Sequence, residues 1–357
     1  MKKKFVLTLA LVLMVAASIV AAPIELKGSI KAGYEMTFNP NGIKALDATE
    51  LNVSGLSLTG DFWKVAVGAD YLKFGKDDYN KGTLTIYLTK ALAEQGMDMG
   101  DLTVDLAIGN MGTLSGPSVY SDPNGSVGDN NYKVRMAGAY STSVTVGYTD
   151  LLSVYFGTSP VDSAKTADFA LDSSVDGKKS VVVGATVAPV TGVKVAVAYA
   201  NYAQNNFQKV DKDPSAKTDM IATYDEDGSF GGSAVVDVAA LADLDFTLTA
   251  SVADVYFLGQ KKNNLLAAVS AGFGDIDAYA EYQMFDKTNN LIGKVSYNGI
   301  ENVGLNAKLT LADLTGTLKT TIGAGASYAM GGVTYALDGS YEVDGAFTLK
   351  PSVKVSF

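Results

Sequence analysis

Apolar and polar residues alternate one by one over most of the chain. In the segment 24–39, one face consists of Ile24, Leu26, Gly28, Ile30, Ala32, Tyr34, Met36 and Phe38. The other face consists of Glu25, Lys27, Ser29, Lys31, Gly33, Glu35, Thr37 and Asn39. Successive side chains of a β-strand point to opposite faces, whereas a helical period would bring charged groups onto the apolar stripe. The pattern therefore predicts a strand.

The same alternation recurs to the last residue. We place the strands at residues 24–39, 49–59, 62–74, 82–90, 101–110, 132–140, 143–157, 180–188, 192–203, 232–240, 244–257, 264–273, 275–286, 291–299, 303–311, 316–328, 332–341 and 346–357. These are 18 strands, and two stretches leave the count open. Apolar residues keep even numbers from Tyr132 to Phe156, so the turn lies either near residue 141 or at Thr149–Asp150. Residues 218–225 are compatible with another strand, and totals of 16 or 20 also fit.

The two faces of these strands differ in kind. One is aliphatic, and the other is small, polar or charged. A soluble β-sandwich also alternates but needs one dry core, whereas this polar face suits a water-filled lumen and the apolar face suits lipid. No stretch after residue 22 has the ~18 consecutive apolar residues of a membrane-spanning helix. We predict an all-β fold: a transmembrane antiparallel β-barrel with short periplasmic turns and long extracellular loops.

The first residues have the composition of an export signal. Lys2, Lys3 and Lys4 precede an apolar run, residues 5–20, which ends in Ala21–Ala22–Pro23. This order is typical of a secretory signal peptide. A membrane anchor is the alternative, but the run is short for a spanning helix. We predict a signal peptide at 1–21, cleaved at Ala21 or Ala22, and a single barrel domain at 22–357.

Composition narrows the chemistry. The 357 residues contain no cysteine and no histidine, which excludes disulfides, Cys or His metal ligands and histidine acid–base catalysis. Lys and Arg number 28 against 38 Asp and Glu, a net charge of −10, so no cation excess exists for nucleic acid. Asp122, Asn124, Ser126 and Asp129 follow a calcium-loop spacing, but Val127 replaces the required glycine. We predict no catalytic residues, no metal and no cofactor.

With these features, the chain resembles bacterial outer-membrane β-barrel proteins of the porin type. The resemblance rests on the Lys2–Ala22 signal, the amphipathic strands and the terminal residues Ser352–Phe357. In such proteins the barrel-assembly machinery reads a final aromatic residue, a role that the resemblance gives to Phe357. General porins carry an arginine cluster at their constriction. Arg135 is the only arginine here, so the resemblance does not extend to that cluster.

Two sets of residues are candidates for a functional surface. Charged residues expected on the polar face would line the pore: Lys31, Glu35, Lys133, Arg135, Asp277, Glu281, Lys308 and Lys319. The simpler interpretation is solvated wall charges that pair with one another. Aromatic residues of the apolar face would anchor the barrel at the membrane interfaces: Tyr34, Trp63, Tyr71, Tyr140 and Tyr282. Tyrosines of the polar face either stack a sugar or fill lumen space: Tyr87, Tyr155, Tyr202 and Tyr279.

The predicted function is an outer-membrane porin, a passive diffusion channel for small hydrophilic solutes and ions. Without its signal the chain has 25 positive and 38 negative residues, and this net −13 favours weak cation preference. The loops 111–130, 158–179 and 204–231 are candidates to fold inward. Expected partners are outer-membrane lipids, the barrel-assembly machinery, solutes or ions, and further copies in a homotrimer. The alternatives are a structural or adhesive barrel whose loops bind a surface layer, peptidoglycan or an external ligand, and a soluble secreted β protein.

Overall fold

The computed structural model describes residues 24–40, 42–48, 50–67, 82–110, 115–120, 132–135, 140–160, 179–205, 223–225, 227–285 and 288–356. The predicted signal peptide, Tyr71, Phe357 and the calcium-like loop lie outside these residues. The described chain forms one sheet of 19 strands and a second sheet of two. The two-stranded sheet pairs β11 (Ala203–Asn205) with β12 (Thr223–Asp225).

The large sheet contains almost every strand that the alternation predicts. Its first half comprises β1 (Ile24–Asn39), β2 (Gly42–Asp47), β3 (Glu50–Thr59), β4 (Trp63–Val67), β5 (Gly82–Tyr87), β6 (Leu102–Asn110), β7 (Tyr140–Tyr148), β8 (Leu152–Pro160), β9 (Lys179–Val190) and β10 (Val193–Ala200). Its second half comprises β13 (Ser229–Asp237), β14 (Thr247–Phe257), β15 (Lys262–Phe273), β16 (Ile276–Phe285), β17 (Thr288–Ile300), β18 (Val303–Ala312), β19 (Lys319–Met330), β20 (Val333–Glu342) and β21 (Phe347–Ser356).

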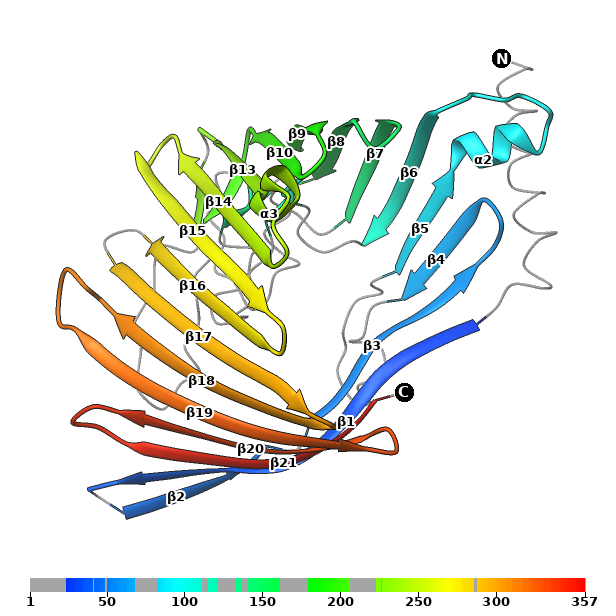
Figure 1. Cartoon of the computed structure of the whole chain (residues 1–357). Helices are drawn as coiled ribbons and strands as arrows, with labels where there is room; N and C mark the ends of the chain where they lie inside the picture. The colour runs from blue at the N-terminus through cyan, green and yellow to red at the C-terminus, as the bar shows by residue number, and fades with distance from the viewer. Residues whose placement is uncertain are drawn as a thin grey trace.

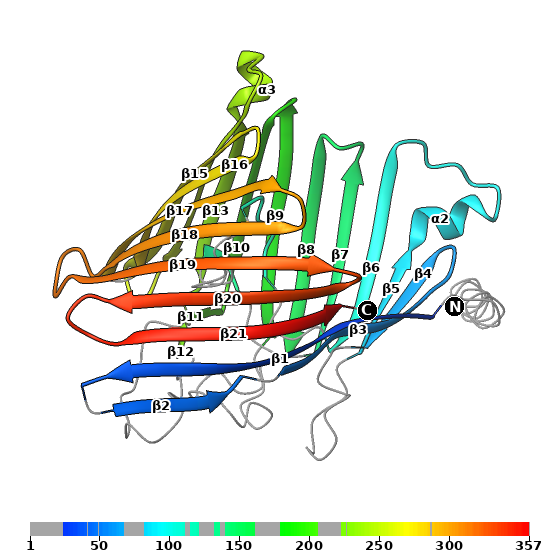
Figure 2. The same cartoon turned by 60° about the horizontal axis from the view of Figure 1, so that its bottom comes forward.

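The pairings of the large sheet close into a ring. Each strand pairs antiparallel with its neighbours along the chain, from β3 through to β21. β1 pairs with β2 and β3 on one flank and with β21 on the other. Because β2 and β3 share one flank of β1, the 19 strands occupy 18 positions around the ring. Figure 1 shows this ring, and Figure 2 shows β17 to β21 and β1 side by side.

The two faces of the ring separate apolar from polar side chains. Large apolar residues are exposed along one face of successive strands, including Phe156, Val197, Val269, Leu309 and Ile322. The opposite face holds the buried polar residues Ser143, Ser159, Ser180, Ser229, Ser233, Asn264, Glu281 and Gln283. An apolar face of this extent is unfavourable in water and suits lipid. We call the apolar face the outer face and the opposite one the inner face.

Connections at one edge of the ring are mostly short. The β7–β8, β9–β10, β15–β16, β17–β18 and β19–β20 turns there have two or three residues, with left-handed backbone at Thr149, Gly192, Gly274, Asn302 and Gly331. Such turns favour residues that tolerate positive φ. Two short helices, α2 (Leu88–Ala93) and α3 (Val238–Ala242), join strands at the same edge. No helix in the described ranges has the length and apolarity needed to span a membrane.

The strand predicted at 132–140 is wrong for residues 132–135. Residues 132–135 are not part of the wall: Tyr132 and Val134 are 2% and 3% exposed, and Arg135 forms an isolated bridge with Ser115. The wall resumes at β7, and the second of the two turn positions, at Thr149–Asp150, is confirmed. Alternation misled the prediction because a segment that packs its apolar side chains onto the inner face also alternates.

The seam between β1 and β21 is interrupted at Pro351. Pairing runs from Ser29–Ser356 to Gly33–Ser352 and resumes at Met36–Leu349. Proline has no backbone N–H, so Pro351 donates no ladder hydrogen bond at the gap. Beside the gap, Lys350 Nζ lies 2.9 Å from Glu35 Oε2. An ion pair thus bridges the two strands where the backbone ladder does not.

Gly33 makes the seam sensitive to added volume. A Cβ at residue 33 would lie 2.7 Å from the Pro351 carbonyl oxygen and 3.0 Å from Ser352 Cβ. We expect Gly33→Ala to lower the temperature at which the folded barrel converts to its unfolded gel mobility, because overpacking costs about 1–3 kcal/mol. Gly293→Ala is the matched control, since no atom lies within 4 Å of a Cβ there. Equal transition temperatures for the two variants would contradict a close-packed seam.

Candidate functional site

A segment between β6 and β7 lies on the inner face. Its described parts are residues 115–120 and 132–135, and they are joined by the Ser115–Arg135 bridge and by the Gly116 N–H, which donates to the Val134 carbonyl over 2.7 Å. We call these two parts the inner segment. It lies against β9, β10 and β13 to β16, which belong to one half of the ring. Residues 115–120 belong to the predicted loop 111–130.

Apolar packing fixes the inner segment in place. Tyr120 and Tyr132 form a buried cluster with Ala253, Leu266 and Ala268. Val134 joins a second cluster with the residues Val182, Ala198, Ala200, Val255 and Phe257. Close approach also requires glycine, because a Cβ at Gly116 would lie 2.4 Å from Ala198 Cβ. The small side chains of the wall therefore make room for the segment.

Hydroxyl groups add directional contacts between the inner segment and β13. The Val119 N–H donates to Ser233 Oγ over 2.9 Å, and Ser118 Oγ donates to the same oxygen over 3.2 Å. Ser233 is 5% exposed. A buried hydroxyl is costly unless it is hydrogen-bonded. These contacts therefore satisfy the buried Ser233 hydroxyl and also orient the inner segment.

A buried carboxylate forms the centre of the contact with β16. Glu281 is 1% exposed and accepts hydrogen bonds from the Tyr120 hydroxyl over 2.7 Å, from the Tyr279 hydroxyl and from Gln283 Nε2. Burial, together with hydrogen bonds to Tyr279 and Glu281, raises the pKa of Tyr120 well above its ordinary value. The Tyr120 hydroxyl therefore stays protonated and remains a donor. Charge-assisted bonds of this kind are the stronger class of protein hydrogen bonds.

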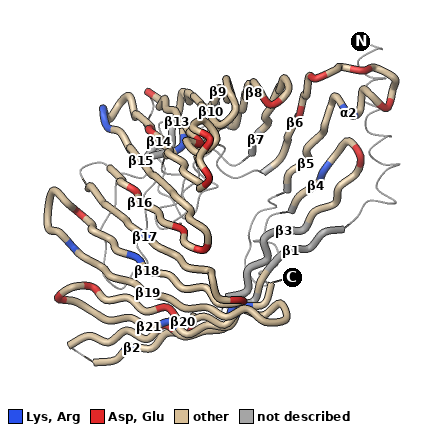
Figure 3. The backbone as a smooth tube through the Cα atoms, viewed as in Figure 1, with Lys and Arg blue, Asp and Glu red and all other residues tan. Residues whose placement is uncertain are grey.

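The other half of the inner face carries lysines and carboxylates in register. Lys294 of β17 lies directly opposite Lys308 of β18. Asp338 of β20 lies opposite Lys350 of β21, which is paired with Glu35. Figure 3 shows that charged positions are sparse along the strands and that β17 and β18 each carry a basic one. No part of the described chain covers this half of the inner face as the inner segment covers the other.

The predicted pore-lining residues divide between these regions. Lys31, Glu35, Glu281 and Lys308 lie on inner-face positions of strands, and Asp277 is exposed at the start of β16. Lys133 and Arg135 belong to the inner segment and not to the wall. Lys319 is exposed at the start of β19. Their role in lining a pore stays a prediction.

The predicted interface aromatics are in differing surroundings. Tyr34 is 61% exposed, whereas Trp63 is fully buried in a cluster with Phe62 and Ala91. A fully buried Trp63 has no surface to place at a membrane interface, which corrects its assignment as an anchor. The Tyr282 hydroxyl donates to Asn289 Oδ1 over 2.9 Å. Tyr140 begins β7, and nothing is described of its side chain.

Sequence reasoning missed several residues of this site. Ser118, Tyr120 and Ser233 were not among the candidates, because their contacts join segments more than 100 residues apart. Lys294 was also missed. Lys294 could have been found from the sequence, because it lies on the polar face of the strand predicted at 291–299. No cluster of three or more carboxylates in the described ranges is placed to hold a metal ion.

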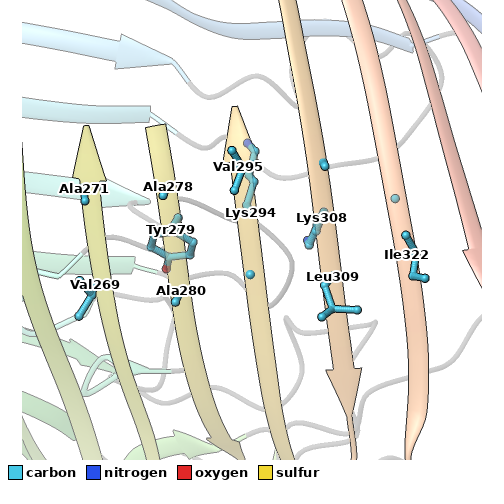
Figure 4. Close-up of a pocket in the computed structure, with 13 residues that line it drawn as sticks. Val269, Ala271, Ala278, Tyr279, Ala280, Lys294, Val295, Lys308, Leu309 and Ile322 are labelled. Carbon is cyan, nitrogen blue, oxygen red and sulfur yellow. The ribbon is translucent and has the colours of Figure 1, made fainter. Parts of the chain in front are cut away.

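The outer face is hollowed over β15 to β19. A groove of about 620 Å³ is lined mainly by outer-face side chains, among them Val269, Ala271, Ala280, Val295, Leu309 and Ile322 (Figure 4). Small alanines and Gly293 leave the space between the larger side chains. The wall is therefore thin at this level, with Lys294 and Lys308 on its other side.

Comparison with known proteins supports the fold. The sequence matches no protein-family model, and no curated protein is similar enough to match it. OpdL of Pseudomonas aeruginosa aligns over 94% of this chain and 98% of its own, with a TM-score of 0.52 and 11% identity. An engineered variant of the Rh. blastica porin aligns over 94% and 100%, with a TM-score of 0.43 and 13% identity. The similarity to OpdL confirms a porin-type barrel fold.

Loss of the Tyr120 hydroxyl should loosen the inner segment. We expect Tyr120→Phe to be cleaved by protease between β6 and β7 about tenfold faster than the unmodified chain, because a hydrogen bond to a charged group contributes about 1.5–3 kcal/mol. Tyr282→Phe is the control, since its hydroxyl contacts Asn289 and not the segment. Cleavage at the same rate in both variants would refute the anchoring role of Tyr120.

Proposed function

We propose that this protein is an outer-membrane channel that lets small hydrophilic solutes and ions diffuse passively. The observation that carries the proposal is the closed ring with an apolar outer face and a polar inner face. Only a barrel without edges satisfies every backbone group in lipid, and such a barrel encloses a lumen. The porin-type fold agrees with a transport role.

The inner segment would constrict this channel. It occupies the inner face of β9, β10 and β13 to β16 and is anchored there through Ser233 and Glu281. On the remaining inner face, Asp338, Glu342 and Lys350 are exposed. Solutes would pass between the segment and this open, charged wall, so that pore width and wall charge together set selectivity.

The remaining assignments follow from the sequence. The export signal at 1–21 and the terminal Phe357 support delivery to the outer membrane by the barrel-assembly machinery. The net charge of −13 supports a weak cation preference. The outer face would contact membrane lipids, and neighbouring copies in a homotrimer would use the same apolar surface.

The absence of cysteine permits a direct test of the channel. Neighbouring positions on β18 offer a matched pair: Asn306 is half-buried on the inner face, and Leu305 is 39% exposed on the outer face. We expect a charged, water-soluble thiol reagent to lower the single-channel conductance of Asn306→Cys in a planar bilayer, because the modified thiol occupies the lumen. The Leu305→Cys channel should be unaffected.

The outcome separates the channel from a plugged barrel. Discrete, long-lived current steps from the unmodified chain are expected. A folded, heat-modifiable barrel that passes no current would refute the channel, and would favour a surface protein that acts through its loops.

A further inference from the structure

We propose that Lys294 and Lys308 form a binding site for small oxyanions, carboxylates or phosphates, on the inner wall. The site deepens the proposed function, because it names a class of solute that the channel would hold in passing. Its transport role rests on that function, whereas binding itself depends only on the folded wall.

The two lysines face each other in an arrangement that a sheet normally avoids. Directly opposite residues of an antiparallel pair have Cβ atoms about 4.5–5.5 Å apart, and like charges there are destabilising. Elsewhere on the same wall opposite signs meet, as at Asp338 and Lys350. A second lysine pair, Lys31 and Lys354, meets across β1 and β21, but there the register also places Glu50 of β3 opposite Lys31. The Lys294–Lys308 pair differs because its outer flanks are the uncharged Tyr279 and Gly323. An anion bound between the two ammonium groups would remove the repulsion.

No acid of the described chain neutralises the pair. Within the part of the chain that the structure describes, neither lysine takes part in an ion pair or hydrogen bond. Both are half-buried, so water screens them less than it screens an exposed lysine. The pair therefore keeps its charge available to a ligand.

The nearest carboxylates are committed to other partners. Glu281 is on β16, two residues beyond Tyr279, which lies opposite Lys294, and it accepts three hydrogen bonds. Glu35 is paired with Lys350, which also faces Asp338. Asp277 lies opposite Ser296 and is approached by Asn298 Nδ2 at 3.5 Å. The positive charge at Lys294 and Lys308 is therefore local.

Neutral donors and free space flank the lysines. The register places Tyr279, whose hydroxyl donates to Glu281, beside Lys294. On the other side it continues from Lys308 through Gly323 to the hydroxyl residues Ser340 and Thr348. A Cβ at Gly323 would meet no atom closer than 3.6 Å, so the wall beside Lys308 is open. Figure 4 shows Lys294 and Lys308 on adjacent strands with Tyr279 on the next. The two ammonium groups, with the Ser340 hydroxyl farther along the same row, are donors that suit the several acceptor oxygens of an oxyanion.

The experiment is a binding titration of inorganic phosphate to the full mature chain, folded in detergent. Lys294→Gln and Lys308→Gln each remove one charge and keep the side-chain length. We expect each to weaken phosphate binding about tenfold, as for the loss of one charge-assisted hydrogen bond. Lys261→Gln, in the exposed turn between β14 and β15, is the matched control and should bind as the unmodified chain does. Heat-modifiable gel mobility confirms that each variant is folded.

Reversal potentials in a salt gradient provide the second measurement. Lys308→Gln should shift the channel toward cations, and Lys261→Gln should not. Absent phosphate binding, or binding equal in all four proteins, overturns the site even if the channel conducts. Phosphate binding that depends on Lys294 and Lys308 in a barrel without current supports the site and refutes the channel, so the two failures are distinguishable.

Discussion

The constraint on which the whole structure depends is that backbone polar groups in lipid must find partners within the protein. A sheet meets this demand only when its first and last strands pair, as β1 and β21 do. Closure then divides all side chains into two populations. The outer face becomes aliphatic, and the inner face collects serines, lysines and carboxylates that would be costly in lipid. Within the wall, charged side chains are thereby concentrated on the inner face.

The inner face meets two opposing requirements. Where the inner segment covers it, polar groups are dry and must be satisfied, which Ser233 and Glu281 achieve through directed hydrogen bonds. Where no described segment covers it, charged side chains such as Asp338 and Lys350 are exposed. The same ring thus holds a tightly packed half and an open half, and the boundary runs between Glu281 of β16 and Lys294 of β17. A solute would meet rigid packing on one side and charge on the other.

Much of this fold could be predicted from the sequence, because strand period and turn chemistry are local properties. The strand at 24–39 agrees with β1, and later strands differ from the structure mostly by a few residues. The prediction for residues 132–135 was wrong because alternation shows that one face of a segment is apolar, but not which surface that face packs against. The site was less predictable. The pairing of Tyr120 with Glu281, and of Lys294 with Lys308, depends on register between strands, which no single segment contains.

Pro351 has a consequence for the order of folding. The β1–β21 pairing joins residues more than 300 positions apart, so loop-closure entropy favours its formation late in folding. Until then β21 is an open edge, and open edges invite pairing with other chains. A proline in the middle of that edge withholds one donor from any incorrect partner. The same interruption that weakens the finished seam therefore protects the unfinished barrel from aggregation.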